Sequence, residues 1–306
     1  MKRILCITPV KHLNGVFEML EDCSEVIYEP SISKDDLRQL LGDSTIDKIF
    51  TNPNKQGFII DESVLSESSI KVINTCSTGT NHIDMKYCLN NNITVWTLTK
   101  DMELINQLPS TSELAFILMG SLFRKVDAGF KDVKDGNWNY EPFMGKQIKD
   151  SSIGIIGYGR LGKIMKKFCD AFGMKVYIYD PYEGYNDLDD LLQNSEVISL
   201  HIHVSDETRD LIDSAFLSKM KKGSYIVNTS RGELVDEGAI IKSIQTGHLS
   251  GYATDVIRDE FCEQSSSKLV EYSKENSNVL ITPHVGGMTR EGQTKAYKWA
   301  INKFKE

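Results

Sequence analysis

The chain has 306 residues, of which 40% are hydrophobic and 25% are charged, and its formal net charge is −8 at pH 7. This length exceeds that of one typical domain, so we expect two domains, each large enough to bury its own core. The acidic balance argues against a nucleic-acid groove, which usually requires a basic face. The net charge does not exclude an anionic substrate, because a few local cations are enough to bind one.

The six cysteines show no Cys-x-x-Cys spacing, and most lie in apolar runs, where cysteine behaves as a small buried hydrophobe. We therefore expect neither a disulfide framework nor a metal site. The segment from Met1 to Pro9 reads as a strand ended by proline, too short for a signal-peptide core. No apolar run approaches the length of a membrane span. We expect a cytoplasmic protein that binds neither membrane nor nucleic acid.

Residues 1–98 alternate short β-branched or apolar runs with helical stretches, which predicts a parallel sheet covered on both faces. The expected strands are Ile4–Thr8, Glu25–Tyr28, Lys48–Thr51, Lys71–Thr75 and Thr94–Leu98. Small residues and Gly79 follow the fourth strand, in the segment 76–84, and their backbone N–H groups suit an anion. As a bare pattern, this segment also reads as an ordinary tight turn.

A mixed, polar stretch from Leu98 to Leu108 is where we place the hinge between the domains. Pro109 then opens a long apolar helix that runs to about Phe123, and Ser110 or Thr111 is expected to cap it. Because this helix is apolar nearly all round, it should be buried in a domain interface or a dimer.

A second α/β array begins with the sequence IGIIGYGRLG at residues 153–162. A short apolar strand here runs into Gly-x-Gly-x-x-Gly, in which Gly157 allows a tight turn, Gly159 admits a phosphate and Gly162 permits close helix–strand packing. The N-terminus of the helix that follows favours a pyrophosphate. Asp180 ends the next strand, about 20 residues after the first glycine, as expected for a ribose-binding acid. The alternative is a glycine turn that binds no ligand.

The remaining strands of this array complete a six-stranded, doubly wound nucleotide-binding fold. The expected strands are Ile153–Ile156, Lys175–Tyr179, Val197–Ile202, Tyr225–Thr229, Tyr252–Asp255 and Leu280–Thr282. Residues 260–278 read as a polar, weakly structured insertion. A final helix from about Thr289 can return to the first domain.

Charged and titratable residues gather where the later strands end. Arg231 follows one strand, Asp255 ends the next with Glu260 shortly after it, and His284 ends the last. Such strand ends converge beside the nucleotide in a doubly wound sheet. An arginine fork suits a carboxylate, and a histidine with a carboxylate suits proton transfer. Each alone is also typical of a surface ion pair or a structural histidine, but the group together favours a site.

The order of these motifs resembles the D-isomer-specific 2-hydroxyacid dehydrogenase family, which includes phosphoglycerate and glycerate dehydrogenases. The resemblance covers nearly the whole chain. The motifs that carry it are the glycine loop, Tyr179-Asp-Pro, Asn228-Thr-Ser-Arg-Gly, Asp255-Val, Glu260, Pro283-His-Val-Gly-Gly, Ser77-Thr-Gly-Thr-Asn-His-Ile-Asp84 and Pro109–Glu113. It implies residues 1–98 and 287–306 as a flavodoxin-like substrate-binding domain, and residues 99–286 as an NAD-binding Rossmann domain, with a cleft between them. It also implies a homodimer joined through the cofactor domain.

The resemblance further implies the site residues. The catalytic set would be Arg231, Glu260 and His284, and the substrate contacts would be Thr78, Gly79, Arg231 and His284. The residues that would line the cofactor are Thr111, Gly157, Tyr158, Gly159, Arg160, Leu161, Gly162, Asp180, Ile202, Thr229, Asp255, Gly286 and Gly287. Asp180 predicts NAD rather than NADP, because a carboxylate accepts a ribose hydroxyl and repels a 2′-phosphate.

These residues predict hydride transfer between nicotinamide and C2 of a D-2-hydroxy acid, with His284 as the acid–base group, Glu260 as its partner and Arg231 as the carboxylate clamp. Two alternatives stay open: an NAD-linked regulatory protein, as in the corepressor branch of the family, and an inorganic or one-carbon anion as substrate. His203 and Phe261 stand where the family usually has proline, and the segment from Cys262 to Asn278 is unusually long. These departures leave the substrate open.

Overall fold

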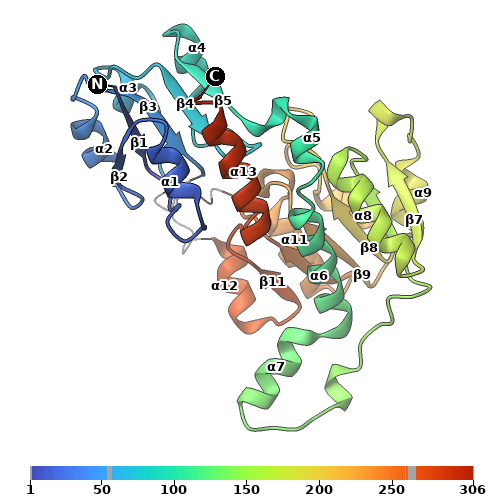
Figure 1. The fold of residues 1–306 in the computed structure, drawn as a ribbon. Coiled ribbons are helices and arrows are strands. Elements are labelled where there is room, and N and C mark those ends of the chain that lie inside the picture. Colours follow the sequence, from blue (N-terminus) through green and yellow to red (C-terminus); the bar gives the residue numbers. More distant parts are fainter. Residues whose placement is uncertain (1, 54–56, 259, 261–266, 306) are drawn as a thin grey trace. The chain divides into compact units, whose positions relative to one another are not determined.

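The structure is a computed structural model that describes residues 2–53, 57–258, 260 and 267–305, apart from the side chain of Lys100. It divides into two compact units, one formed by Met1–Leu108 and Met288–Glu306 and the other by Pro109–Gly287. Each unit contains one parallel sheet covered by helices, as predicted (Figure 1).

The first unit contains a five-stranded parallel sheet in the order β2-β1-β3-β4-β5, the flavodoxin-like order. Its strands are β1 (Arg3–Cys6), β2 (Glu25–Tyr28), β3 (Ile46–Thr51), β4 (Val72–Thr75) and β5 (Thr94–Trp96). Its helices are α1 (Val16–Glu21), α2 (Lys34–Leu40), α3 (Glu62–Leu65), α4 (Met85–Asn90), η1 (Leu98–Lys100), α5 (Met102–Ile105) and α13 (Arg290–Asn302).

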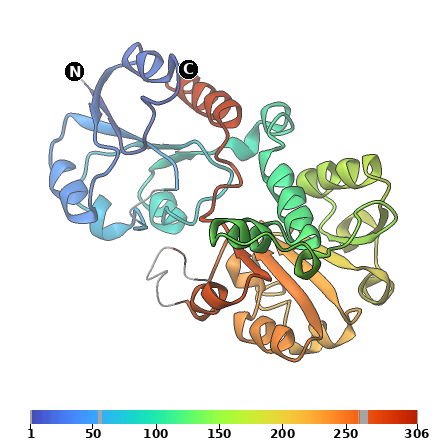
Figure 2. The same cartoon turned by 90° about the horizontal axis from the view of Figure 1, so that it is seen from below.

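Alternate side chains along the strands of this sheet pack on its two opposite faces. Ile4 and Cys6 pack with buried residues of α1 and α13, whereas Leu5 packs with those of α2, α3 and α4. Successive side chains of a strand point to opposite faces, so one strand serves both layers. The C-terminal helix α13 therefore lies beside α1, at the other end of the chain (Figure 2).

The second unit contains a six-stranded parallel sheet in the order β11-β10-β9-β8-β6-β7. Its strands are β6 (Ser152–Ile156), β7 (Lys175–Tyr179), β8 (Val197–Leu200), β9 (Ser224–Asn228), β10 (Leu249–Thr254) and β11 (Val279–Ile281). Its helices are α6 (Ser110–Arg124), α7 (Val126–Lys134), η2 (Glu141–Phe143), α8 (Arg160–Ala171), η3 (Pro181–Glu183), α9 (Leu188–Asn194), α10 (Ser214–Lys219), η4 (Gly232–Leu234), α11 (Glu237–Gln245) and α12 (Lys268–Glu275).

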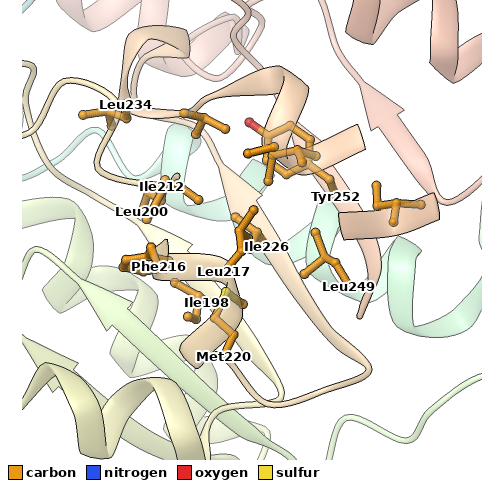
Figure 3. Packing of buried hydrophobic residues seen from close by; sticks show 14 of the residues in the cluster. Ile198, Leu200, Ile212, Phe216, Leu217, Met220, Ile226, Leu234, Leu249 and Tyr252 are labelled. Atoms are coloured by element: carbon orange, nitrogen blue, oxygen red, sulfur yellow. The ribbon is translucent and has the colours of Figure 1, made fainter. Parts of the chain in front are cut away.

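Two apolar clusters cover the two faces of the second sheet. On one face, residues of β6, β8, β9 and β10 pack against α6 and α8, which lie side by side in Figure 1. On the other face the same strands pack against α9, α10, α11 and α12. Figure 3 shows the centre of this second cluster, where Leu200, Ile226 and Tyr252 are buried together. The sheet is doubly wound because both faces are covered.

The strand β6 lies between β7 and β8. The chain therefore goes from β6 to β7 on one side and then crosses to β8 on the other side of β6. A doubly wound sheet binds ligands at such a switch point, at the carboxyl ends of the strands. The glycine loop follows β6 directly and therefore occupies this position.

Three sequence-based expectations differ from the structure. The boundaries between the units lie at Leu108/Pro109 and Gly287/Met288, rather than after residues 98 and 286. The reason is apolar packing, since Leu98 and Ile105 join Ala296 in one cluster of the first unit. The expected insertion also contains a regular helix, α12, which packs against α11.

The helix after Pro109 is the third difference. Pro109 itself occupies the N-cap position of α6, so Ser110 and Thr111 lie inside the helix rather than capping it. The apolar side of α6 is covered by the sheet and α8 of its own unit. Its remaining face leaves Ile117 60% exposed. None of the helices in the described ranges is long and apolar enough to cross a membrane.

Candidate active site

The predicted site residues of the second unit lie in the loops that follow its strands, at one edge of the sheet. Gly157 follows β6, Asp180 follows β7, Ile202 follows β8 and Thr229 and Arg231 follow β9. Asp255 and Glu260 come after β10, and His284 after β11. Ile202, Thr229 and Asp255, predicted as strand residues, belong to loops because each strand ends one or two residues earlier. Parallel pairing brings all these loops to the same edge.

The glycine loop has the geometry of a phosphate-binding turn. Gly157 has φ +92°, and a Cβ there would lie 2.4 Å from the His201 carbonyl oxygen. Among the described residues, no heavy atom other than those of the chain neighbours lies within 4 Å of a Cβ built on Gly159, the N-cap residue of α8. Gly162 lies in the first turn of this helix. The loop therefore leaves open the side from which an anion approaches a helix N-terminus.

The Asp180 carboxylate binds the glycine loop as well as its own turn. Its Oδ2 accepts a hydrogen bond from the Tyr158 backbone N–H at 2.7 Å, and its Oδ1 accepts one from Tyr182 N–H at 3.1 Å. Asp180 is partly buried. The contact with Tyr158 was not predicted, because sequence spacing does not show which backbone group an acid reaches. Asp180 thus holds the loop between β6 and α8 against the end of β7.

Thr229 and Arg160 are two further residues at this edge of the sheet. Thr229 Oγ1 is buried and has no hydrogen-bond partner among the described residues. Burial lowers the pKa of the Arg160 guanidinium, which lies in the first turn of α8. The α8 backbone is held to α6 because Ser112 Oγ donates to the Leu161 carbonyl at 3.0 Å. The open glycine loop, the acid at the end of β7 and the unpartnered Thr229 hydroxyl together fit a dinucleotide such as NAD.

Asp255 holds together the loop that follows β11. It is 2% exposed, and its carboxylate accepts hydrogen bonds from Thr282 Oγ1 at 2.5 Å, Val285 N–H at 2.8 Å and Gly286 N–H at 2.7 Å. Burial raises the pKa of this carboxyl group, and the hydrogen bonds oppose that effect. Gly286 is also close to Thr111, whose Cγ2 would lie 3.3 Å from a Cβ on the glycine. Asp255, Thr111 and Gly286 therefore form one cluster, with Gly287 next in the chain.

His284 is paired with Glu260. The His284 Nδ1 lies 2.8 Å from Glu260 Oε1, and the two side chains are 39% and 15% exposed. A carboxylate only accepts hydrogen bonds, so Nδ1 is the donor in this pair, and in the neutral imidazole Nε2 is then the acceptor. His284 also has φ +53°, a left-handed conformation that non-glycine residues rarely adopt. Its backbone N–H is bound to the Asp255 carbonyl at 2.9 Å, which helps to hold this conformation.

Arg231 stands on a loop that Asn228 organises. The Asn228 side chain accepts a hydrogen bond from Ser230 N–H at 3.0 Å and donates one to the Arg231 carbonyl at 2.9 Å. The Arg231 guanidinium donates to the Ser230 carbonyl at 2.6 Å. Within the described ranges it forms no ion pair with a carboxylate. A guanidinium without a paired carboxylate suits binding of an anion from outside the chain.

Thr78 and Gly79 belong to the first unit, in the loop after β4. Ser77 Oγ donates to the Gly79 carbonyl at 2.6 Å, and Thr75 Oγ1 lies 2.9 Å from Ser77 Oγ. Within the part of the chain that the structure describes, the N–H groups of Thr78 and Gly79 bind no protein acceptor. The loop thus presents two backbone donors, as an anion site would.

Several residues singled out in the sequence are not among the site residues described above or lie outside the described ranges. His203, one of the two departures from the family pattern, is exposed. Phe261, the other, lies outside the described residues, as do Cys262 and Lys55. Lys11 Nζ lies 4.3 Å and 4.5 Å from the ring centroids of Phe17 and Tyr28. Among the described side chains, no cluster of histidine, cysteine and carboxylate groups could hold a metal ion.

The arrangement is matched by a model of a protein family. Residues 116–286 match the model described as "D-isomer specific 2-hydroxyacid dehydrogenase, NAD binding domain", which takes in more than half of the chain. The matched range includes the glycine loop, Asp180, Arg231, Glu260 and His284.

Individual relatives agree with that match. The chain is 32% identical over 251 residues to a hydroxypyruvate reductase of Thermotoga maritima, with 78% of each chain covered. It is 30% identical over 245 residues to a D-3-phosphoglycerate dehydrogenase of Synechocystis, a match that covers 77% of this chain and only 42% of that relative. The chain thus spans less than half the length of this relative.

Among solved structures, a D-lactate dehydrogenase of Aquifex aeolicus, complexed with NAD and lactic acid, has a TM-score of 0.80 and 27% sequence identity. The alignment covers 99% of this chain and 94% of that one. The similarity therefore extends over both units and is not confined to the nucleotide-binding fold.

Proposed function

Because the chain belongs to the D-isomer specific 2-hydroxyacid dehydrogenase family, we propose that it is an NAD-dependent oxidoreductase acting on a small D-2-hydroxy acid and its 2-oxo acid. The observation that carries this proposal is the pair of His284 and Glu260, 2.8 Å apart, at the strand edge that also bears Arg231. A proton shuttle and an anion-binding cation are the protein groups that such a reaction requires.

The nicotinamide, when bound, supplies the hydride for reduction or accepts it in oxidation. In oxidation His284 Nε2 takes the hydroxyl proton of the substrate, and in reduction it returns that proton to the 2-oxo oxygen. Glu260 accepts the hydrogen bond from Nδ1–H, so it fixes the tautomer and stabilises the imidazolium that forms. Arg231 binds the substrate carboxylate through its planar fork.

The substrate carboxylate also fits the backbone donors of Thr78 and Gly79, which we propose as substrate contacts. The proposed cofactor contacts are Thr111, the glycine loop from Gly157 to Gly162, Asp180, Ile202, Thr229, Asp255, Gly286 and Gly287. The open side of Gly159 and the unpartnered Thr229 hydroxyl support this assignment. Asp180 favours NAD over NADP, because its carboxylate repels a 2′-phosphate.

We also propose that the protein is a homodimer that uses the segment from Val126 to Met144. Phe130 is 65% exposed and Trp138 is 86% exposed, which is unusual for large apolar side chains. Val126, Phe130 and Val133 follow the spacing of one helix face on α7, and no residue of this helix is buried within the unit. Such a face is stabilised by a partner chain, and the expected partner is a second copy.

The test is an NADH-oxidation screen with glyoxylate, hydroxypyruvate, pyruvate and phosphohydroxypyruvate, followed by His284→Gln on the best substrate. Removing the acid–base group should lower turnover by about a hundredfold or more. The matched control is His203→Gln, an exposed histidine outside the pair, which should keep wild-type turnover. Near-normal turnover of His284→Gln would exclude the assignment. NADH binding without reduction of any 2-oxo acid would favour a regulatory protein instead.

A further inference from the structure

One carboxylate, that of Glu237, holds the chain on both sides of Glu260. Its Oε1 accepts a hydrogen bond from the Arg258 backbone N–H at 3.0 Å, and its Oε2 accepts one from Ser267 Oγ at 3.3 Å. Arg258 precedes Glu260 by two residues and Ser267 follows it by seven. The Glu237 side chain stands at the start of α11, outside the group of residues predicted to touch substrate or cofactor.

The Arg258 side chain adds a second set of contacts at the same place. Its guanidinium donates to the Val235 carbonyl at 3.0 Å and forms an ion pair with Asp210. Ser267 is fixed independently, because its hydroxyl accepts the cap hydrogen bond from Val270 N–H at the start of α12. Both residues that Glu237 binds are therefore held by other elements of the second unit.

The same segment touches the loop of Arg231. A Cβ built on Gly232 would lie 2.1 Å from the Ile257 carbonyl carbon and 2.3 Å from the Arg258 nitrogen. Only a glycine allows this approach, so the backbone after Arg231 packs directly on the backbone that leads to Glu260. Glu237 lies five residues further along the chain. A displacement of Arg258 would thus reach both Glu260 and the Arg231 loop.

We propose that Glu237 is a positioning residue that keeps the Glu260 carboxylate in hydrogen-bond contact with His284. The inference rests on the proposed function, in which that contact fixes the tautomer of the proton shuttle. The Glu260–His284 bond is 2.8 Å long, and such bonds lose most of their value beyond about 3.5 Å. Loss of Glu237 removes one of the hydrogen bonds that hold the backbone two residues before Glu260, and we expect the Glu260–His284 distance to lengthen as a result.

If Glu237 had only a structural role, its loss would affect stability and not the His284–Glu260 pair. A carboxylate in the first turn of a helix also stabilises that helix through its dipole. Loss of that effect would lower stability alone, without a specific effect on His284. The experiment therefore needs measurements that do not depend on the stability of the helix.

The test compares Glu237→Ala, which removes both acceptors, with Glu237→Gln, which keeps one acceptor oxygen, in the full chain. The control is Glu271→Ala in the neighbouring helix α12, an exposed glutamate that pairs with Lys274 at the surface. Glu260→Gln and the double variant Glu237→Ala/Glu260→Gln complete a cycle. The measurements are kcat and its pH profile on the best 2-oxo acid, the Kd for NADH, and the thermal midpoint.

We expect Glu237→Ala to lower kcat by about tenfold to a hundredfold, the range that misplacement of a catalytic group produces. The Kd for NADH should stay within about twofold of wild type, since the glycine loop is untouched. The pH profile should approach that of Glu260→Gln, and the double variant should be no slower than Glu260→Gln alone. Glu237→Gln should lie between Glu237→Ala and wild type.

A proton NMR signal gives a readout that needs no turnover. The imidazole N–H bonded to a carboxylate resonates far downfield, so the wild type should show this signal and Glu260→Gln should lose it. Glu237→Ala should shift or broaden it, and Glu271→Ala should leave it unchanged. An unchanged signal in Glu237→Ala, or an equal loss of kcat when Glu260 is already replaced, would overturn the proposal. Failure of the proposed function is separate, because the wild type would then reduce no 2-oxo acid.

Discussion

Two glycines of the glycine loop are required for different reasons, so replacing each with alanine should have different effects. Gly157 has φ +92° and would place a Cβ 2.4 Å from the His201 carbonyl oxygen. Gly159 has φ −70°, an ordinary value, and a Cβ there would have no atom within 4 Å in the part of the chain that the structure describes, apart from its chain neighbours. Gly157→Ala should therefore damage the fold, whereas Gly159→Ala should damage only cofactor binding.

The magnitudes follow from these two environments. At Gly157, a left-handed conformation costs an L-residue about 1–2 kcal/mol, and crowding in a packed site adds about 1–3 kcal/mol. Gly157→Ala should thus lower the free energy of unfolding by about 2–5 kcal/mol. At Gly159, alanine fits the backbone, so the free energy of unfolding should stay the same or rise by up to about 1 kcal/mol. The methyl group would stand where a pyrophosphate approaches, and NADH affinity should fall at least tenfold, about 1.4 kcal/mol.

The assay is a urea unfolding curve for each variant, paired with an NADH titration followed by fluorescence. Gly184→Ala would not serve as a control, because that residue also has a positive φ. Ala171→Gly, at the other end of α8, tests whether a change in helix propensity alone affects NADH binding. The reasoning is refuted if Gly157→Ala unfolds like wild type, or if Gly159→Ala binds NADH with wild-type affinity.

Three further predictions concern selectivity, pH and assembly. Asp180→Ala should reduce the preference for NADH over NADPH by tenfold or more, seen in parallel titrations, and an unchanged ratio would contradict the role of this carboxylate. Burial lowers the pKa of His82 to about 4, so the folded state binds fewer protons than the unfolded state and stability falls as pH decreases below about 6.5. Between pH 6.5 and 5 the loss attributable to this group is about 2 kcal/mol, and the difference between wild type and His82→Gln in urea curves at the two pH values should show it. Phe130→Asp should convert the proposed dimer to a monomer in sedimentation experiments, whereas Met102→Asp, at another exposed apolar residue, should not; a monomeric wild type would exclude the dimer.

The strands were predictable because a buried parallel strand leaves a strong local signal. The strands β2 and β7 have the predicted bounds, Glu25–Tyr28 and Lys175–Tyr179, and the others differ by only a few residues at either end. Ends were less accurate because burial continues into the loops. Val197–Ile202 was expected as one strand, and the structure ends β8 at Leu200, before His201.

The helices and the domain boundaries were harder to predict, because they depend on contacts between residues far apart in the sequence. Nothing local in residues 98–108 shows that Leu98 and Ile105 pack beside Ala296, nearly 200 positions later. The helix after Pro109 was predicted to be buried in a domain interface or a dimer, but its apolar side packs within its own unit, and the exposed apolar face belongs to α7. Helix α12 was missed because polar residues dominate the segment 260–278, although Leu269, Val270 and Tyr272 of this helix pack against the core.

The sequence pointed to the individual residues of the candidate site, which stay a proposal, but it did not show their hydrogen bonds. Arg231, Glu260 and His284 are the residue types that proton transfer and anion binding need, and they follow strands that the sequence makes recognisable. Glu237 gave no such signal. A glutamate at a helix start is common, and its contacts with Arg258 and Ser267 join residues 21 and 30 positions away.

The sequence by itself determined the two parallel sheets, the glycine loop and the residue types of the candidate site. These features arise from local patterns: apolar runs of strand length, glycine spacing and chemical type. Only the tertiary structure decided the strand orders, the bond of Asp180 to Tyr158, the left-handed conformation of His284 and the contacts of Glu237. Each of these depends on which loops parallel pairing brings to one edge of a sheet, and that is a property of the packed chain rather than of any short segment.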